Sequence, residues 1–197
     1  MMPRLPPHSP GQRIGLFGGS FNPAHEGHRQ VALYALKKLR LDWVWWLVSP
    51  QNPLKDTSET AAYAQRFAQT KALARHPRFV VTDIESQIGS RTTIETLRAL
   101  KHYADAQFVW IMGADSLAGL HHWHDWKEIV ETVPLAVLAR PGYSIRALGS
   151  VAALRYLEAR VPMESPQVLA AKHPPAWAFI SMPLRKESST AIRAAQS

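Results

Sequence analysis

Two histidines stand three residues apart, just after a glycine-rich turn near the start of the chain. The segment reads Gly-Leu-Phe-Gly-Gly-Ser-Phe-Asn-Pro-Ala-His-Glu-Gly-His over residues 15–28. If a helix begins here, His25 and His28 share one of its faces, and the helix start adds free backbone N–H groups and a positive dipole end. Two imidazoles beside a helix start could stabilise a phosphoryl group that gains charge in a transition state.

The glycines of this turn fit the same chemistry. Gly18 and Gly19 would let backbone N–H groups approach a phosphate with no side chain in the way. Other interpretations remain, because many α/β proteins have a strand–Gly–Gly–helix turn and the histidines could be structural or bind a metal. Metal-binding pairs on a helix favour a spacing of four, and no third ligand is obvious, so we expect no protein-bound metal.

A second polar motif lies near the other end of the chain. Residues 188–193 read Ser-Ser-Thr-Ala-Ile-Arg, which places hydroxyls at an expected helix start and Arg193 in its first turn. The hydroxyls could simply cap the helix, although capping and phosphate binding use the same N–H groups. Arg193 could add a bidentate clamp on phosphate oxygens.

Alternating apolar runs and helical patterns must position these motifs. We predict strands over 14–17, 43–48, 79–82, 108–112, 135–139 and 177–181, and helices over 26–39, 61–75, 93–102, 125–132, 151–160 and 190–195. This alternation indicates an α/β protein with a Rossmann-like doubly wound, mostly parallel sheet and helices on both faces. Ligands bind beyond the carboxyl ends of such strands, and motifs follow the strands that end near Phe17, Met112 and Ser181.

The composition is that of one folded domain. We expect a flexible Pro-rich tail over 1–13, a single domain over 14–197 and a loop over 161–175. There is no cysteine, which excludes disulfides and thiolate metal sites. No window approaches the ~18 apolar residues of a membrane span, and no secretory signal is visible, so we expect no membrane partner and a cytoplasmic location.

A formal net charge of +8 favours an anionic partner. A polyphosphate nucleotide and a nucleic acid both fit this description. The basic residues are scattered, and a solvated basic surface explains them equally well. The scattered residues include Arg66, Lys71, Arg75, Arg78, Arg98 and Lys101.

The first motif closely resembles the signature of the nucleotidyltransferase superfamily, a glycine-rich turn that leads into His-x-Gly-His. The second is similar to that family's Ser-Ser-Thr-x-Ile-Arg segment. The resemblance, which spans about 14–194, implies that ATP is held by Gly18, Gly19, Ser20, Ser189, Thr190 and Arg193. Three positions depart from the family pattern: Ser20 replaces threonine, Asn22 replaces aspartate, and Glu187 replaces an apolar residue.

The middle of the chain resembles the bacterial nicotinate mononucleotide adenylyltransferases of this superfamily. The resemblance rests on the loop 49–55, the segments Thr-Thr-Ile-Glu-Thr-Leu and Gly-Ala-Asp-Ser-Leu, the tryptophans after them, and Arg-Pro-Gly. It implies that the acceptor is bound by Thr93, Asp115, Trp123 and Arg140, although Thr92 replaces the family's tyrosine. Trp123 could stack on a pyridine ring or simply pack in the core. The hydroxyl-rich stretch 90–96 would read the ring carboxylate.

The resemblance also implies a reaction. An oxygen of the nicotinate mononucleotide phosphate would attack the α-phosphorus of ATP, and pyrophosphate would leave, with His25, His28 and Lys55 as the catalytic residues. Mg²⁺ would be carried with ATP. A nicotinamide mononucleotide or phosphopantetheine acceptor stays open, and so does a nucleic-acid-binding module, although we expect no nucleic acid partner. The sequence does not indicate an oligomeric state.

Overall fold

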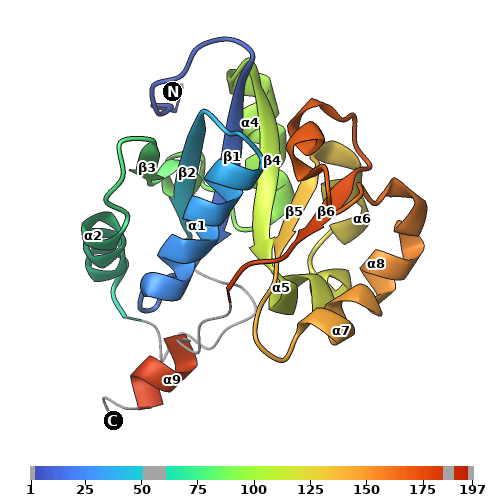
Figure 1. Ribbon diagram of the computed structural model, residues 1–197. Coiled ribbons are helices and arrows are strands. Elements are labelled where there is room, and N and C mark those ends of the chain that lie inside the picture. Colours follow the sequence, from blue (N-terminus) through green and yellow to red (C-terminus); the bar gives the residue numbers. More distant parts are fainter. Residues whose placement is uncertain (1–2, 51–60, 184–188, 195–197) are drawn as a thin grey trace.

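A computed structural model describes residues 3–50, 61–183 and 189–194. The described part forms a sheet of 6 parallel strands in the order β3-β2-β1-β4-β5-β6, with helices on both faces (Figure 1). This is the doubly wound, Rossmann-like architecture expected from the sequence. The strands are β1 (Gln12–Gly19), β2 (Trp43–Val48), β3 (Phe79–Thr82), β4 (Ala106–Gly113), β5 (Leu135–Leu138) and β6 (Trp177–Ile180).

The helices cover the sheet in two unequal layers. One face carries α1 (Glu26–Lys38), α2 (Tyr63–Leu73) and the 3-10 helix η4 (Pro166–Ala171), the last within the expected loop 161–175. The other carries α3 (Ile84–Ile88), α4 (Thr93–Tyr103), α5 (Ala114–Ala118), α6 (Trp126–Thr132), α7 (Ser144–Leu148) and α8 (Val151–Arg155). Two further 3-10 helices are η2 (Leu120–His122) and η3 (Leu157–Ala159), and α9 (Ser189–Ala194) follows β6.

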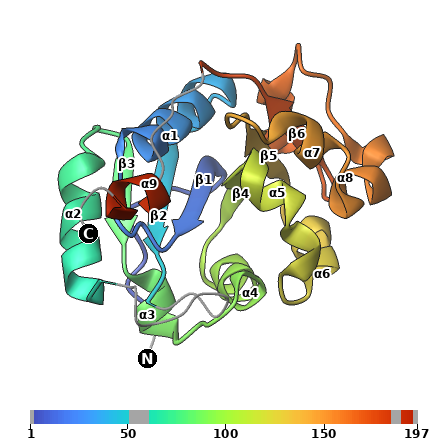
Figure 2. The ribbon, with the colours of Figure 1, turned by 90° about the horizontal axis from the view of Figure 1, so that it is seen from below.

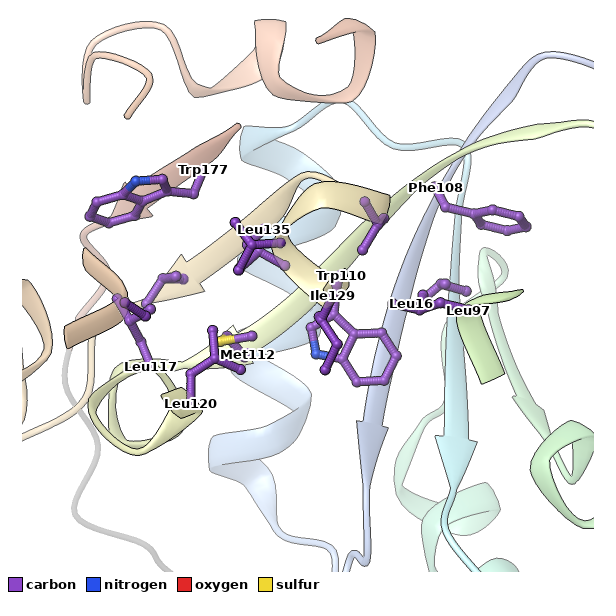
Figure 3. Close-up of a cluster of buried hydrophobic side chains, with 14 of the residues drawn as sticks. Leu16, Leu97, Phe108, Trp110, Met112, Leu117, Leu120, Ile129, Leu135 and Trp177 are labelled. Atoms are coloured by element: carbon purple, nitrogen blue, oxygen red, sulfur yellow. The ribbon is translucent and has the colours of Figure 1, made fainter. Parts of the chain in front are cut away.

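Each face of the sheet buries its own hydrophobic core. Strands covered on both faces need apolar residues at successive positions, and β2 reads Trp-Val-Trp-Trp-Leu-Val. Alternate side chains of β4 enter opposite cores, so that Phe108, Trp110 and Met112 share one core (Figure 3) while Val109 lies in the other. The two cores fix the register of the strands, and with it the position of every loop at the carboxyl edge.

Each predicted strand and helix has a counterpart in the structure, but the short helices α3, α5 and α7 were not predicted. The strands over 43–48 and 79–82 are confirmed to the residue, but the helix expected over 151–160 is wrong beyond Arg155. The Trp177 indole N–H donates to the Tyr156 carbonyl at 2.7 Å, and Arg160 forms a parallel bridge with Trp177. These contacts occupy backbone that a longer α8 would need, so the chain continues as η3.

Residues ahead of β1 contact the domain. The backbone N–H of Arg4 donates to Gln87 at 2.7 Å, Leu5 packs against the first core, and the ring of His8 meets Trp45 edge-on at 5.5 Å. The division into a flexible tail over 1–13 and a domain over 14–197 stays a prediction. Among the described residues, no helix is long and apolar enough to cross a membrane.

Candidate active site

The two motifs of the sequence converge at the carboxyl edge of the sheet. Neighbouring strands β1 and β4 are where the strand order reverses, and ligands of doubly wound sheets bind in the crevice beyond this point. The turn after β1, the start of α1 and helix α9 all lie at this edge, which faces the viewer in Figure 2. The edge therefore collects the residues whose spacing indicated phosphate chemistry.

The turn after β1 is shaped by packing. A Cβ on Gly18 would lie 2.6 Å from the Trp110 indole, so this glycine makes room for a buried ring as well as for any phosphate. Phe21 adopts a left-handed backbone with φ of 45°, a conformation that costs a non-glycine residue about 1–2 kcal/mol. Its buried ring packs against Phe17, Trp46 and His28, and these contacts hold the strained turn in place.

The two histidines lie side by side at the start of α1. Their ring centroids are 3.8 Å apart, and His25 is buried with 5% of its surface exposed. The Nδ1 atom of His28 accepts the backbone N–H of His25 at 3.2 Å. A neutral imidazole that accepts through Nδ1 carries its proton on Nε2, so His28 is set as an Nε2–H donor. Phe21 meets the His28 ring edge-on at 5.2 Å and restrains its orientation.

Side-chain hydrogen bonds dock helix α9 on this turn. The Ser189 hydroxyl donates to the Pro23 carbonyl at 3.0 Å, and Arg193 Nη1 donates to the Asn22 carbonyl at 2.6 Å. The second motif thereby meets the first from more than 160 positions away in the sequence. The side chain of Thr190, and the whole of Lys55 and Glu187, lie outside the described residues.

Arg66 is a buried cation that the sequence analysis placed among the scattered surface charges. Only 1% of it is exposed, and it donates to four backbone carbonyls, at distances of 2.6 to 3.0 Å. Those carbonyls belong to Ser20, Ser49, Pro50 and Ala61. Burial lowers the pKa of Arg66, although Tyr63 opposes this shift. The visible signal was its place on the helix that comes next in the chain after the loop 49–55.

The expected acceptor residues lie at the ends of α4, β4 and β5. Thr93 is half-buried in the first turn of α4, whose N-cap is Thr92 with a capping box to Glu95. Asp115 and Arg140 follow β4 and β5 and form an ion pair at 3.8 Å. Trp123 is half-buried against the first core, in agreement with core packing, and its contact with a ligand stays a prediction.

The hydroxyls of the stretch 90–96 require a correction. Ser90 and Thr96 are buried, and their oxygens lie 2.9 Å apart. Thr96 also donates to the buried carboxylate of Glu85 at 3.3 Å. These two hydroxyls therefore face the protein interior and do not line a ligand surface. The expectation that the whole stretch 90–96 contacts the ring carboxylate is wrong for Ser90 and Thr96. Thr93 remains the candidate for this contact.

A cavity of about 710 Å³ lies at the opposite, amino edge of the sheet. Its lining combines apolar residues of α1 with basic side chains: Arg13, Lys37, Lys38, Arg40 and Arg78. None of the motif residues belongs to it, so the hollow and the polar motifs occupy different ends of the sheet. Within the described ranges, no group of three or more His, Cys, Asp or Glu side chains could hold a metal ion.

Comparison with known proteins gives consistent matches. The model of the cytidylyltransferase-like family matches residues 16–195. A probable nicotinate-nucleotide adenylyltransferase of Cereibacter sphaeroides is 53% identical over 182 residues, which cover 92% of this chain and 96% of that protein. One from Caulobacter sp. is 50% identical over 185 residues, which cover 93% and 98%.

Solved structures show the same fold at low identity. The Plasmodium falciparum nicotinic acid mononucleotide adenylyltransferase complexed with NaAD has a TM-score of 0.68 at 16% identity, covering 93% of this chain and 83% of that one. The same enzyme complexed with APC has a TM-score of 0.66 at 15% identity, with the same shares covered. This likeness supports the doubly wound architecture.

Proposed function

Since the chain belongs to the cytidylyltransferase-like family, we propose that it is a nicotinate-nucleotide adenylyltransferase of NAD biosynthesis. It transfers AMP from ATP to nicotinate mononucleotide and yields nicotinate adenine dinucleotide and pyrophosphate. The observation that carries this proposal is the match, at 50% identity or more and over nine-tenths of both chains, to relatives of that name. The convergence of His25, His28 and Arg193 on one turn supports it.

The proposed mechanism is alignment and charge stabilisation. A phosphate monoester is largely a dianion near neutral pH, so an oxygen of the acceptor phosphate attacks the α-phosphorus of ATP without a general base. The bond between the α-phosphorus and the bridging oxygen breaks, and the negative charge leaves on pyrophosphate. His25 and His28 would donate to the α- and β-phosphates, with Lys55 adding positive charge.

The remaining ATP contacts are assigned to the turn and to α9. Gly18, Gly19 and Ser20 would hold the phosphates from the β1 side, and Ser189, Thr190 and Arg193 would hold the β- and γ-phosphates. Magnesium is proposed to arrive on ATP. The described side chains here are imidazoles, hydroxyls and a guanidinium, whereas Mg²⁺ prefers oxygen ligands such as carboxylates and phosphates.

The acceptor would lie on the other side of the reacting phosphate. Trp123 would stack on the pyridine ring, and Thr93 would donate to its carboxylate. The Asp115–Arg140 pair, at the ends of β4 and β5, would contact the acceptor's ribose phosphate half. We also propose a cytoplasmic location, where this reaction's nucleotides are found.

The test is pyrophosphate release from ATP with a panel of acceptors. We expect release with nicotinate mononucleotide and formation of the dinucleotide. Release only with phosphopantetheine would identify a different member of the fold. No release with any acceptor, together with salt-dependent retention on DNA, would overturn the proposal in favour of a nucleic-acid-binding module.

A further inference from the structure

Glu85 is a buried acid that the proposed mechanism does not use. It lies in the first turn of α3 with 6% of its surface exposed. Burying a carboxylate costs free energy unless its oxygens are hydrogen-bonded. Both oxygens have partners: Oε2 accepts the Ser49 hydroxyl at 2.8 Å, and Oε1 accepts the Thr96 hydroxyl at 3.3 Å.

The two partners belong to different parts of the candidate site. Ser49 directly follows β2, and its backbone N–H donates to the Gly19 carbonyl at 3.0 Å. This bond ties Ser49 to the turn after β1, residues 18–23, which is the proposed phosphate turn. Thr96 is fully buried in the first turns of α4, three residues after Thr93. Glu85 therefore connects the end of β2 to the start of α4 through two side-chain hydrogen bonds.

Further hydrogen bonds hold the segment before α4 against α3. The Ser90 hydroxyl lies 2.9 Å from the Thr96 hydroxyl and 3.4 Å from the Glu85 carbonyl, and the Ser90 N–H donates to the same carbonyl at 3.0 Å. The single Thr96 hydroxyl proton is shared between the Glu85 carboxylate and the Thr92 carbonyl, and the Thr96 oxygen can accept from Ser90. The segment that leads into α4 is thus held against α3 at several points.

We propose that Glu85 is a positioning residue for the acceptor nucleotide, because it fixes the start of α4, and hence Thr93, relative to the phosphate turn at Gly19. The proposal rests on the proposed function. An apolar side chain in this place would avoid the desolvation cost of a carboxylate but would bond neither hydroxyl. What the acid adds is two hydrogen bonds that fix where Ser49 and Thr96 lie relative to each other. A displacement of about 1 Å in a bound reactant can cost about 100-fold in rate.

The experiment compares two isosteric variants, Thr96→Val and Thr70→Val. Both threonines are fully buried in helices, and each donates to the backbone carbonyl four residues earlier, Thr92 at 3.2 Å and Arg66 at 2.8 Å. Thr96 also bonds Glu85. We expect Thr96→Val to raise the KM for nicotinate mononucleotide about 10-fold or more and the KM for ATP by less than about twofold. Thr70→Val should change neither constant.

A second pair of variants tests the hydrogen bonds themselves. In Glu85→Gln the amide oxygen can accept from Ser49 and the NH₂ can donate to Thr96, whose hydroxyl serves as either donor or acceptor. Glu85→Leu can do neither. We therefore expect Glu85→Leu to behave like Thr96→Val, and Glu85→Gln to restore the acceptor KM to within about threefold of the parent value.

The outcomes separate the two proposals. If the parent protein releases no pyrophosphate with nicotinate mononucleotide, the proposed function fails, and the role of Glu85 fails with it. The parent could be active while Thr96→Val and Thr70→Val both lower the melting temperature and leave the KM for nicotinate mononucleotide unchanged. In that case the role of Glu85 is only structural. An equal rise of both KM values, or a Glu85→Gln variant as poor as Glu85→Leu, would also overturn the positioning role.

Discussion

His28 is oriented by the backbone of His25, because the His28 Nδ1 atom accepts the His25 N–H and leaves the ring proton on Nε2. We expect His28→Ala to lower kcat by about 10²–10³ and to change ATP binding far less, since it removes one donor to developing charge. Steady-state kinetics and ATP titration measure the two effects. His76→Ala, at the amino-edge cavity, is the control and should keep full turnover. A His28→Ala enzyme within about threefold of the parent would refute the assignment.

A second prediction at the scale of one residue concerns the pH dependence of stability, through Glu85. Burial raises its pKa above the ordinary value of 4.5, against the opposing bonds from Ser49 and Thr96. The folded protein then keeps this proton to higher pH than the unfolded chain does, so the stability linked to it is full below about pH 4.5 and is lost as the pH rises through the folded pKa.

Urea unfolding across this pH range tests the linkage. The free energy of unfolding of the parent, minus that of Glu85→Gln, should fall as the pH rises from about 4.5, because glutamine does not titrate. All other titrating groups are the same in the parent and in Glu85→Gln, so their contributions cancel in this difference. A difference that stays constant, or that grows with pH, would mean that the pKa of Glu85 is not raised in the folded state.

At the scale of elements, side-chain hydrogen bonds attach α9 to the turn after β1. Its Ser189 and Arg193 bond the carbonyls of Pro23 and Asn22, and neither core of the described residues includes a residue of α9. A chain that ends at Pro183 should therefore fold with nearly the parent melting temperature. We expect its KM for ATP to rise strongly and its turnover to fall, because the contacts proposed for the β- and γ-phosphates would be lost. An active truncated enzyme would contradict the placement of the second motif.

Helix α2 is held to the site by Arg66, whose bonds span four carbonyls in three different segments. Arg66→Met should leave these acceptors unsatisfied and lower the free energy of unfolding by about 2 kcal/mol or more. Arg66→Lys should rescue little, because one ammonium cannot reproduce the guanidinium's planar fork. Lys71→Met, on an exposed part of the same helix, is the control for denaturant unfolding. Equal losses in the two methionine variants would disprove the clamp.

The same elements show how far the sequence could predict the fold. Apolar runs such as Trp43–Val48 identify a buried strand to the residue, because both faces of a covered strand must be apolar. The helices Ile84–Ile88, Ala114–Ala118 and Ser144–Leu148 were missed because five residues hold too little of a helical period to recognise. Helix α8 ends early through a contact with Trp177, which is distant in sequence and so left no local signal.

For the site, spacing could predict which residues stand together but not which way they face. The adjacency of His25 and His28 was expected from their spacing of three, although His25 is the N-cap of α1 and the two residues meet through a capping box. The inward direction of Ser90 and Thr96 depends on Glu85, and the burial of Arg66 depends on carbonyls from other segments. Such contacts form only when the sheet is assembled, so no local pattern reveals them.

Across the whole molecule, the strand order separates two kinds of surface. The motifs gather at the carboxyl ends of β1 and β4, where the strand order reverses. The basic cavity lies at the amino edge, formed by the end of α1 and the starts of the first strands. Part of the net charge of +8 therefore lies away from the proposed reaction. The acceptor, in contrast, would be held by elements from both halves of the sheet: Thr93 on α4 and, beyond β4 and β5, Trp123 and Arg140.

This assembly leads to a prediction about acceptor choice. Nicotinate mononucleotide carries a ring carboxylate where the nicotinamide nucleotide carries a neutral amide. With Ser90 and Thr96 turned inward, the acid would be read by Thr93 and by backbone N–H groups at the start of α4. A charge-assisted hydrogen bond is worth about 1.5–3 kcal/mol, and a helix start favours an anion.

We therefore expect kcat/KM for nicotinate mononucleotide to exceed that for nicotinamide mononucleotide by at least about 10-fold. This ratio requires a difference of only about 1.4 kcal/mol in activation free energy. Competition between the two mononucleotides at limiting concentration, with the dinucleotide products separated by chromatography, measures this ratio. Thr93→Val should lower the ratio, because it removes the hydroxyl but keeps the shape of the helix start. Equal use of both acceptors by the parent would mean that Thr93 and the start of α4 do not face the ring substituent, even if adenylyl transfer itself proceeds as proposed.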